Sequence, residues 1–124
     1  MSNLKGFLID VQNSNPYVAE TDGTIDAIYS ILKCTLFDIA TRKIGEHYYD
    51  IYCDDEGLLK DKPVVSAMSP DNQPMLVGNL FIVKHNDEGD AVSLTDEEIK
   101  EIQRNLTPIF DEDGRYYPCL ICDY

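Results

Sequence analysis

The chain has 124 residues, of which 44% are hydrophobic and 27% are charged, a composition that suits one globular domain able to fold without a metal or a disulfide. Ten Lys and Arg residues stand against 23 Asp and Glu residues, which gives a formal net charge of −13. This negative charge argues against free nucleic acid and anionic membrane as partners, because both carry negatively charged phosphate groups. It would attract a basic protein partner. The simpler interpretation is that the charge serves solubility alone.

Short runs of β-branched and aromatic residues, separated by Gly, Pro, Asn and Asp, predict strands, and two runs with helical spacing predict helices. In chain order, we expect strands at 5–11 and 17–20, a helix from Thr24 to about Lys33, strands at 34–44, 47–53 and 79–84, a helix after Thr95, and a closing hairpin of 109–110 with 116–121. Turn clusters are expected at 13–16, 54–57, 86–89 and 111–114.

Both helices are predicted from their first residues as well as from their spacing. Thr24 is the expected N-cap of the first helix, because apolar residues recur at helical spacing directly after it. Thr95 and Glu98 form the pattern of a capping box, and the acidic residues between them suit the positive end of a helix. Pro108 is expected to end this second helix.

The segment 58–78 is interrupted by three prolines, Pro63, Pro70 and Pro74, yet it is too apolar for a solvated linker. We expect it to pack on the sheet as a loop or a short helix. The short turns between the other strands imply a mainly antiparallel sheet with the two helices on one side. The predicted fold class is therefore α+β, as one compact domain over residues 1–124.

Three acidic clusters at 54–56, 87–88 and 111–113 each precede a Gly. A calcium-binding loop needs oxygen ligands at alternating positions and a Glu at a fixed distance, which none of these stretches has. Turns that place Gly in the left-handed region account for all three clusters. We expect no metal site.

Four cysteines occur, and only Cys119 and Cys122 are close in sequence. A zinc site requires four ligands, usually as two close pairs, and a redox pair favours the start of a helix, whereas this pair follows Pro118 in a strand-like tail. The N-terminus has no apolar secretory region, and no apolar run approaches the length of a membrane span. We expect free thiols and a cytoplasmic location.

Catalysis has little support in the sequence. His47 and His85 are the two histidines, and neither lies in a motif with a nucleophile. Nucleophile-elbow and phosphate-loop glycine patterns do not occur. We expect a protein without enzyme activity and without a cofactor.

Arginines are few and therefore informative, because the planar guanidinium matches a phosphate group. Arg104 lies at the expected end of the second helix, and Arg115 precedes Tyr116, whose ring could hold a base. We predict Arg104, Arg115, Tyr116 and Phe81 as ligand-contacting residues, with Asn105 and Lys84 as weaker candidates. A surface charge next to strand tyrosines is the simpler interpretation of the same residues.

Several short stretches between Thr24 and Leu106 occur in an order that resembles the pattern of a known family. They are the helix start at 24–28, the turn at 53–60, the strand at 78–83 and the turn and capping box at 86–98. In this order they resemble a family of uncharacterised proteins carried by phages and mobile elements, catalogued as a domain of unknown function (DUF3846). The tail after Leu106 falls outside the resemblance, which supplies no catalytic residues.

The resemblance implies a phage or mobile-element accessory protein in a bacterial cytoplasm, a class that often counters host defence. One route is a sponge, which sequesters a small nucleotide-derived signal of the cyclic nucleotide or cyclic ADP-ribose type, similar in role to Thoeris anti-defence proteins. The alternative is an acidic DNA mimic or a protein-interaction module, with the segment 58–78 as a possible face.

The sequence favours the sponge, because its acidic residues concentrate in turns and at a helix start rather than along one face. Exposed strand edges and an aromatic-rich tail favour a homo-oligomer.

Overall fold

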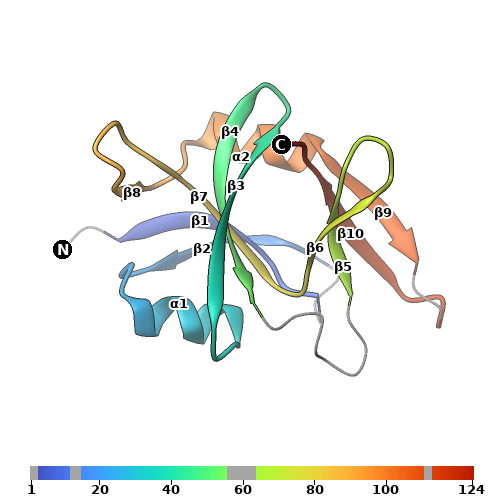
Figure 1. Ribbon diagram of the computed structural model, residues 1–124, viewed down its shortest axis with the longest axis horizontal. Coiled ribbons are helices and arrows are strands. Elements are labelled where there is room, and N and C mark those ends of the chain that lie inside the picture. Colours follow the sequence, from blue (N-terminus) through green and yellow to red (C-terminus); the bar gives the residue numbers. More distant parts are fainter. Residues whose placement is uncertain (1–2, 12–14, 56–63, 111–112) are drawn as a thin grey trace.

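Two β-sheets and two helices build the protein (Figure 1). The computed structural model describes residues 3–11, 15–55, 64–110 and 113–124, so the expected turns at 13–16, 54–57 and 111–114 lie partly outside it. The first sheet contains β1 (Leu4–Ile9), β2 (Tyr17–Thr21), β3 (Phe37–Ile44), β4 (His47–Asp54), β7 (Leu80–His85) and β8 (Ala91–Val92). The second contains β5 (Val65–Met68), β6 (Pro74–Val77), β9 (Leu106–Phe110) and β10 (Tyr116–Ile121), and the helices are α1 (Ile25–Leu32) and α2 (Asp96–Arg104).

Strand pairing is antiparallel at every described pair except one. The first sheet has the order β2-β1-β7-β4-β3, and β8 pairs with the end of β7. The second sheet has the order β6-β5-β10-β9, in which β10 and β5 run parallel. The α+β class with mainly antiparallel sheets is thus confirmed, but as two sheets rather than one.

The central strands of the first sheet bury side chains on both faces. Leu8 and Phe81 belong to a cluster that α1 covers with Ile28 and Leu32. The alternate residues of the same strands belong to a second cluster, which includes residues of α2 and of the second sheet. Successive side chains of a strand point to opposite faces, so the two helices cover opposite sides of the sheet. The expectation that both helices lie on one side is wrong.

Local sequence signals set the helix starts as predicted. The Thr24 hydroxyl accepts a hydrogen bond from the Ala27 backbone at 3.2 Å. At α2 the capping box is complete, because the Thr95 amide donates to Glu98 at 2.7 Å and the Glu98 amide donates to Thr95 Oγ1 at 3.3 Å. The predicted end at Pro108 is wrong: α2 ends at Arg104, and the proline lies within β9.

The segment expected to be a loop or short helix is instead a hairpin over its described part, 64–78. Pro70 lies in its turn, where the Ser69 amide donates to the Gln73 carbonyl at 2.9 Å and Asn72 adopts a positive φ of 64°. Pro74 is the first residue of an edge strand, a position that requires no ladder donor. Pro70 and Pro74 therefore lie at the turn and at a strand start, where they do not prevent the two strands.

Two of the open sheet edges are partly closed. On β3, Lys43 exchanges backbone hydrogen bonds of 2.7 and 2.9 Å with Asp123, and the Arg42 guanidinium donates to the Thr41 carbonyl at 2.9 Å. On β9, the pairing register leaves Pro108 facing away from β10, where it offers no N–H to another strand. Both features oppose edge-to-edge association. The homo-oligomer stays a prediction.

Gly6 of β1 lies close to Phe81 and Ile82 of β7, and its substitution tests the packing of the first sheet under α1. A Cβ at this position would lie 2.6 Å from the Ile82 carbonyl oxygen and 2.7 Å from the Phe81 ring. We expect Gly6→Ala to lower the free energy of unfolding by about 1–3 kcal/mol, because the backbone oxygen cannot move aside. Urea denaturation of Gly6→Ala, Phe81→Leu and the double variant measures the coupling between the two sites. Purely additive effects would contradict a clash with the Phe81 ring and leave the Ile82 carbonyl oxygen as the cause of the loss.

Candidate functional site

Phe81, one of the four predicted ligand-contacting residues, lies in the core. Its side chain is fully buried under α1, and its ring makes an edge contact with Tyr52 at a centroid distance of 6.4 Å. The side chain therefore has no surface to offer a ligand from solvent.

Arg115 and Tyr116 lie together at the end of the β9–β10 hairpin. The Tyr116 ring is 41% exposed and meets the Phe110 ring, which is 67% exposed, at a centroid distance of 6.0 Å. The Arg115 guanidinium donates to the Val11 carbonyl at 2.9 Å. An exposed aromatic pair is thus present on the strand ends that the sequence indicated, and Arg115 precedes Tyr116 in the chain.

Arg104 lies at the opposite end of the same hairpin. In the pairing register Leu106 is opposite Leu120, whereas Phe110 is opposite Tyr116. Four residues of extended strand separate the two ends, which is about 13 Å. The structure therefore does not bring the predicted residues together into one site.

A hollow of about 260 Å³ contains Arg104, between the β3–β4 turn and α2. Its other lining residues are His47, Tyr49, Glu46, Glu97, Glu98 and Glu101. The two weaker candidates are engaged beside it, because Lys84 Nζ lies 2.8 Å from Glu98 Oε1 and the Asn105 side chain donates to the Glu101 carbonyl at 2.8 Å. Four carboxylates outnumber the one guanidinium, so this hollow does not suit a phosphate.

The buried carboxylate of Glu101 organises this hollow. It accepts hydrogen bonds from the Tyr49 hydroxyl at 2.7 Å and from the Glu46 amide at 3.4 Å, and its Oε1 lies 2.8 Å from His47 Nδ1. The turn residue Gly45 has a positive φ of 64°, and a Cβ there would lie 2.9 Å from Glu101 Cγ. The network therefore attaches α2 to the turn between β3 and β4.

The charge states of this network follow from burial and hydrogen bonding. Burial raises the pKa of Tyr49, and the hydrogen bond to Glu101 raises it further, so the phenol stays protonated as a donor. Burial also acts to raise the pKa of Glu101, but the hydrogen bonds from Tyr49, His47 and the Glu46 backbone outweigh it and lower the pKa below its usual value of 4.5. Glu101 is thus held as a carboxylate.

A second carboxylate–histidine pair lies on the other face of β4. His85 Nδ1 is 2.7 Å from Asp50 Oδ2, and the Thr41 hydroxyl donates to Asp50 Oδ1 at 2.9 Å. Because Thr41 bonds to the carboxylate and not to the imidazole, the three residues do not form the nucleophile–base–carboxylate chain of a catalytic triad. The sequence shows both histidines as isolated. The pairing of β7 with β4 brings His85 to Asp50, and the packing of α2 brings Glu101 to His47.

The cysteines are all free thiols. Burial raises the pKa of Cys53 and of Cys122 to about 11 and that of Cys119 to about 12. Burial thus favours the protonated form of these thiols, whereas a redox pair uses a thiolate.

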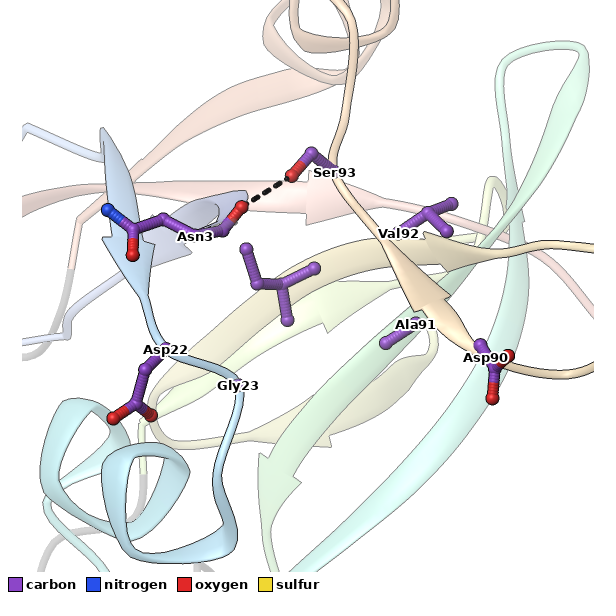
Figure 2. A pocket seen from close by; sticks show the side chains of 8 residues that line it. Asn3, Asp22, Gly23, Asp90, Ala91, Val92 and Ser93 are labelled. Atoms are coloured by element: carbon purple, nitrogen blue, oxygen red, sulfur yellow. Dashed lines mark hydrogen bonds between the residues drawn. The ribbon is translucent and has the colours of Figure 1, made fainter. Parts of the chain in front are cut away.

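A hollow of about 470 Å³ lies between the start of β1, the link from β2 to α1, and β8 (Figure 2). Leu4, Ala91 and Val92 provide its apolar surface, and Asp22 and Asp90 provide its charged groups. Its remaining lining residues are Asn3, Gly23 and Ser93, and Figure 2 shows the Ser93 hydroxyl bonded to the Asn3 carbonyl at 3.2 Å.

The sequence alone does not indicate this hollow, because Asp22 lies in a turn next to Gly23 and Asp90 directly follows the expected turn at 86–89. Asp22 does stabilise its turn, since its Oδ1 accepts hydrogen bonds from the Thr24 amide at 2.9 Å and the Thr24 hydroxyl at 2.7 Å. These bonds lower the pKa of Asp22, so the group stays charged. No sequence signal indicates that Asp90, far along the chain, lies across from it.

Two smaller hollows complete the set described. One of about 210 Å³ beside β6 is lined by Asp38, Asp54 and Asp55 together with Cys53, Met75, Leu76 and Val77. One of about 200 Å³ near the C-terminus is lined by Lys43, Gly45, Pro70, Asn105, Ile121, Cys122 and Asp123. Three of the four hollows thus carry two or more carboxylates, and only Lys43 and Arg104 add a full positive charge to any of them.

The fold and its surface define an acidic α+β protein with two sheets that share a core and with shallow hollows lined by carboxylates. Residues 4–107 match the family described as "Domain of unknown function (DUF3846)", so the chain belongs to this family. The match extends over most of the chain and confirms the resemblance seen in the sequence. Neither the curated proteins nor the solved structures contain a match to this chain. Neither described helix is long and apolar enough to span a membrane.

Glu101 provides a test of the network between α2 and the β3–β4 turn. Because its pKa is lower in the folded chain, it stabilises the fold above its usual pKa, and the effect is lost as pH falls through the folded value. We expect Glu101→Gln to reduce the free energy of unfolding at pH 7 by about 1–3 kcal/mol. The difference between wild type and variant should shrink in acid, as measured by urea denaturation across pH. Glu97→Gln, an exposed change on the same helix, is the control, and an equal loss in both variants would contradict the role of Glu101.

Proposed function

We propose that the protein binds a positively charged region of a partner protein and, as a phage or mobile-element accessory protein, inhibits a host defence protein in this way. The observation that supports the proposal is the charge around its surface hollows. The hollow of Asp22 and Asp90 and the hollow beside β6 are lined by carboxylates and by no basic residue within the described chain. A cationic group is attracted to such a surface, and a phosphate is repelled.

The distribution of these carboxylates favours a protein partner over mimicry of DNA. They come from turns, strand ends and α2, and they line three separate hollows. Mimicry of a phosphate backbone would need a regular row of charges along one face. Basic side chains that project from a folded partner can reach separate acidic hollows individually, which is how charge complementarity sets partner choice at protein interfaces.

The proposal is tested with two peptides of equal length that carry a neutral dye. One alternates Lys and Arg with Leu, and the other carries Glu at the basic positions. We expect the basic peptide to bind and its affinity to fall between about 0.01 and 0.15 M salt, because exposed charges are screened. Fluorescence anisotropy measures both. Absence of binding by the basic peptide at the lower ionic strength would overturn the proposal.

A second candidate is the sequestration of a nucleotide-derived signal, and the end of the β9–β10 hairpin favours it. Arg115 can meet a phosphate, and the exposed rings of Tyr116 and Phe110 can stack on a base. The site is open rather than enclosed, so tight sequestration there would need a second protein surface that covers the ligand.

Native mass spectrometry with a panel of cyclic nucleotides and cyclic ADP-ribose isomers tests this candidate. We expect a stoichiometric adduct that releases intact ligand on heating if the protein is a sponge. Arg115→Ala should abolish the adduct, and Arg104→Ala should preserve it, because the two arginines lie at opposite ends of the hairpin. An adduct that survives Arg115→Ala would show that the hairpin end is not the site.

A further inference from the structure

The hollow of Asp22 and Asp90 exists because two strands share one edge of β7. β1 pairs with the first half of β7, from Leu80 to Ile82, and β8 pairs with its last two residues. The chain after β8 returns to β1, where the Leu94 amide donates to the Lys5 carbonyl at 2.9 Å. The hollow opens where β8 diverges from the start of β1 (Figure 2).

The walls of this hollow are held in place by hydrogen bonds on both sides. On one side, the Lys5 amide donates to the Ser93 hydroxyl at 2.8 Å, which ties β1 to the residue after β8. On the other side, Asp22 caps the turn into α1 through Thr24, and Gly23 between them adopts a positive φ of 78°. The site is therefore formed before any ligand arrives, which lowers the entropy cost of binding.

The lining combines an apolar surface with two separate negative charges. Leu4, Ala91 and Val92 form the apolar part, and Figure 2 shows Asp22 and Asp90 on opposite sides of it. Both hydrogen bonds from Thr24 end on Oδ1 of Asp22. Within the described part of the chain, Oδ2 of Asp22 can therefore accept a hydrogen bond from a ligand. Lys5, the neighbouring basic residue, lies 3.2 Å from Asp96 instead.

This combination matches the shape of a basic side chain. Lysine and arginine carry a long apolar stem that packs on apolar surface, and a charged head that hydrogen-bonds to carboxylates. The volume of about 470 Å³ lies in the range of binding sites, and the hollow opens to solvent, so a side chain can enter from the surface of a partner. A phosphate or carboxylate ligand would face two like charges.

We infer that this hollow is the anchor for a lysine or arginine side chain of the partner protein. The inference rests on the proposed function and names the place where the basic partner is held. A side chain docked there contacts β1, β8 and the β2–α1 link at once, so recognition depends on the folded sheet and not on net charge alone.

The experiment is a titration of the ¹⁵N-labelled protein with the basic peptide used above, followed by amide chemical shifts at physiological ionic strength. We expect the largest shifts at Gly23 and at residues 90–93. Asp22→Asn with Asp90→Asn should weaken binding at least about tenfold, because a hydrogen bond to a charged group is lost at each site. Asparagine keeps an oxygen that can accept from Thr24, so the turn is preserved.

Two further variants separate the anchor from general attraction. Asp71→Asn with Glu20→Gln removes two exposed negative charges that line none of the hollows described above, so both double variants have the same net charge. This control should weaken binding much less than the pair at the hollow. Ala91→Phe fills the hollow without any change of charge and should also abolish the shifts at residues 90–93. Thermal denaturation of each variant verifies the fold.

The outcomes separate this inference from the proposed function. Equal weakening in the two double variants, or full binding by Ala91→Phe, overturns the anchor and leaves the acidic surface as the binding element. Absence of peptide binding by the wild type overturns both. Spermine, titrated in place of the peptide, tests a free polyamine: tight binding of spermine without binding of the peptide would overturn the assignment to a protein side chain.

Discussion

Burial of both faces of the central strands is the constraint on which the rest of the structure depends. β1, β7 and β4 present one set of apolar side chains to α1 and the alternate set to α2 and the second sheet. A sheet with one solvated face could carry charges in its middle, but this one cannot, because an unpaired charge in such a core is too costly. Where a carboxylate does lie inside, at Asp10, Asp50 and Glu101, neighbouring side chains hydrogen-bond to it.

The same constraint determines where the charges of the chain can go. Most of the acidic residues lie at turns, strand ends and the first turn of α2, so they gather at the ends of the strands, here called the rims of the sheets. At a rim, backbone geometry leaves shallow hollows, and the carboxylates of different elements face one another across them. A protein of this construction has several acidic rims and no deep enclosed site among the described residues, which suits contact with another macromolecule better than enclosure of a small molecule.

Local signals in the sequence identified much of the fold. The capping box at Thr95, the N-cap at Thr24 and the closing hairpin depend on residues a few positions apart, and all three are present. The hairpin of β5 and β6 was missed because its prolines were read as strand breakers, although they lie at its turn and at its edge. The number of sheets could not be read from the sequence, because it depends on which distant strands pair.

The candidate site was less accessible to sequence reasoning than the fold. Arg115 and Tyr116 were found together because they are neighbours in the chain, whereas Arg104 was grouped with them without knowledge of the register that separates them. Phe81 was chosen as an aromatic residue in a strand, and strand periodicity alone does not reveal that α1 covers its face. Asp22 and Asp90 line the same hollow only because β8 diverges from β1, and no local pattern in the sequence indicates this arrangement.

The backbone pairing of Lys43 with Asp123 joins the two sheets into one hydrogen-bonded system. Asp123 follows β10 of the second sheet, and Lys43 belongs to the edge strand of the first, while the Arg42 guanidinium lies 4.8 Å from the centre of the Tyr124 ring. Loosening of the second sheet would release this edge, and loosening of the edge would release the end of β10. Neither layer can open without exposing backbone of the other, which favours a single cooperative transition in which the two layers fold and unfold together.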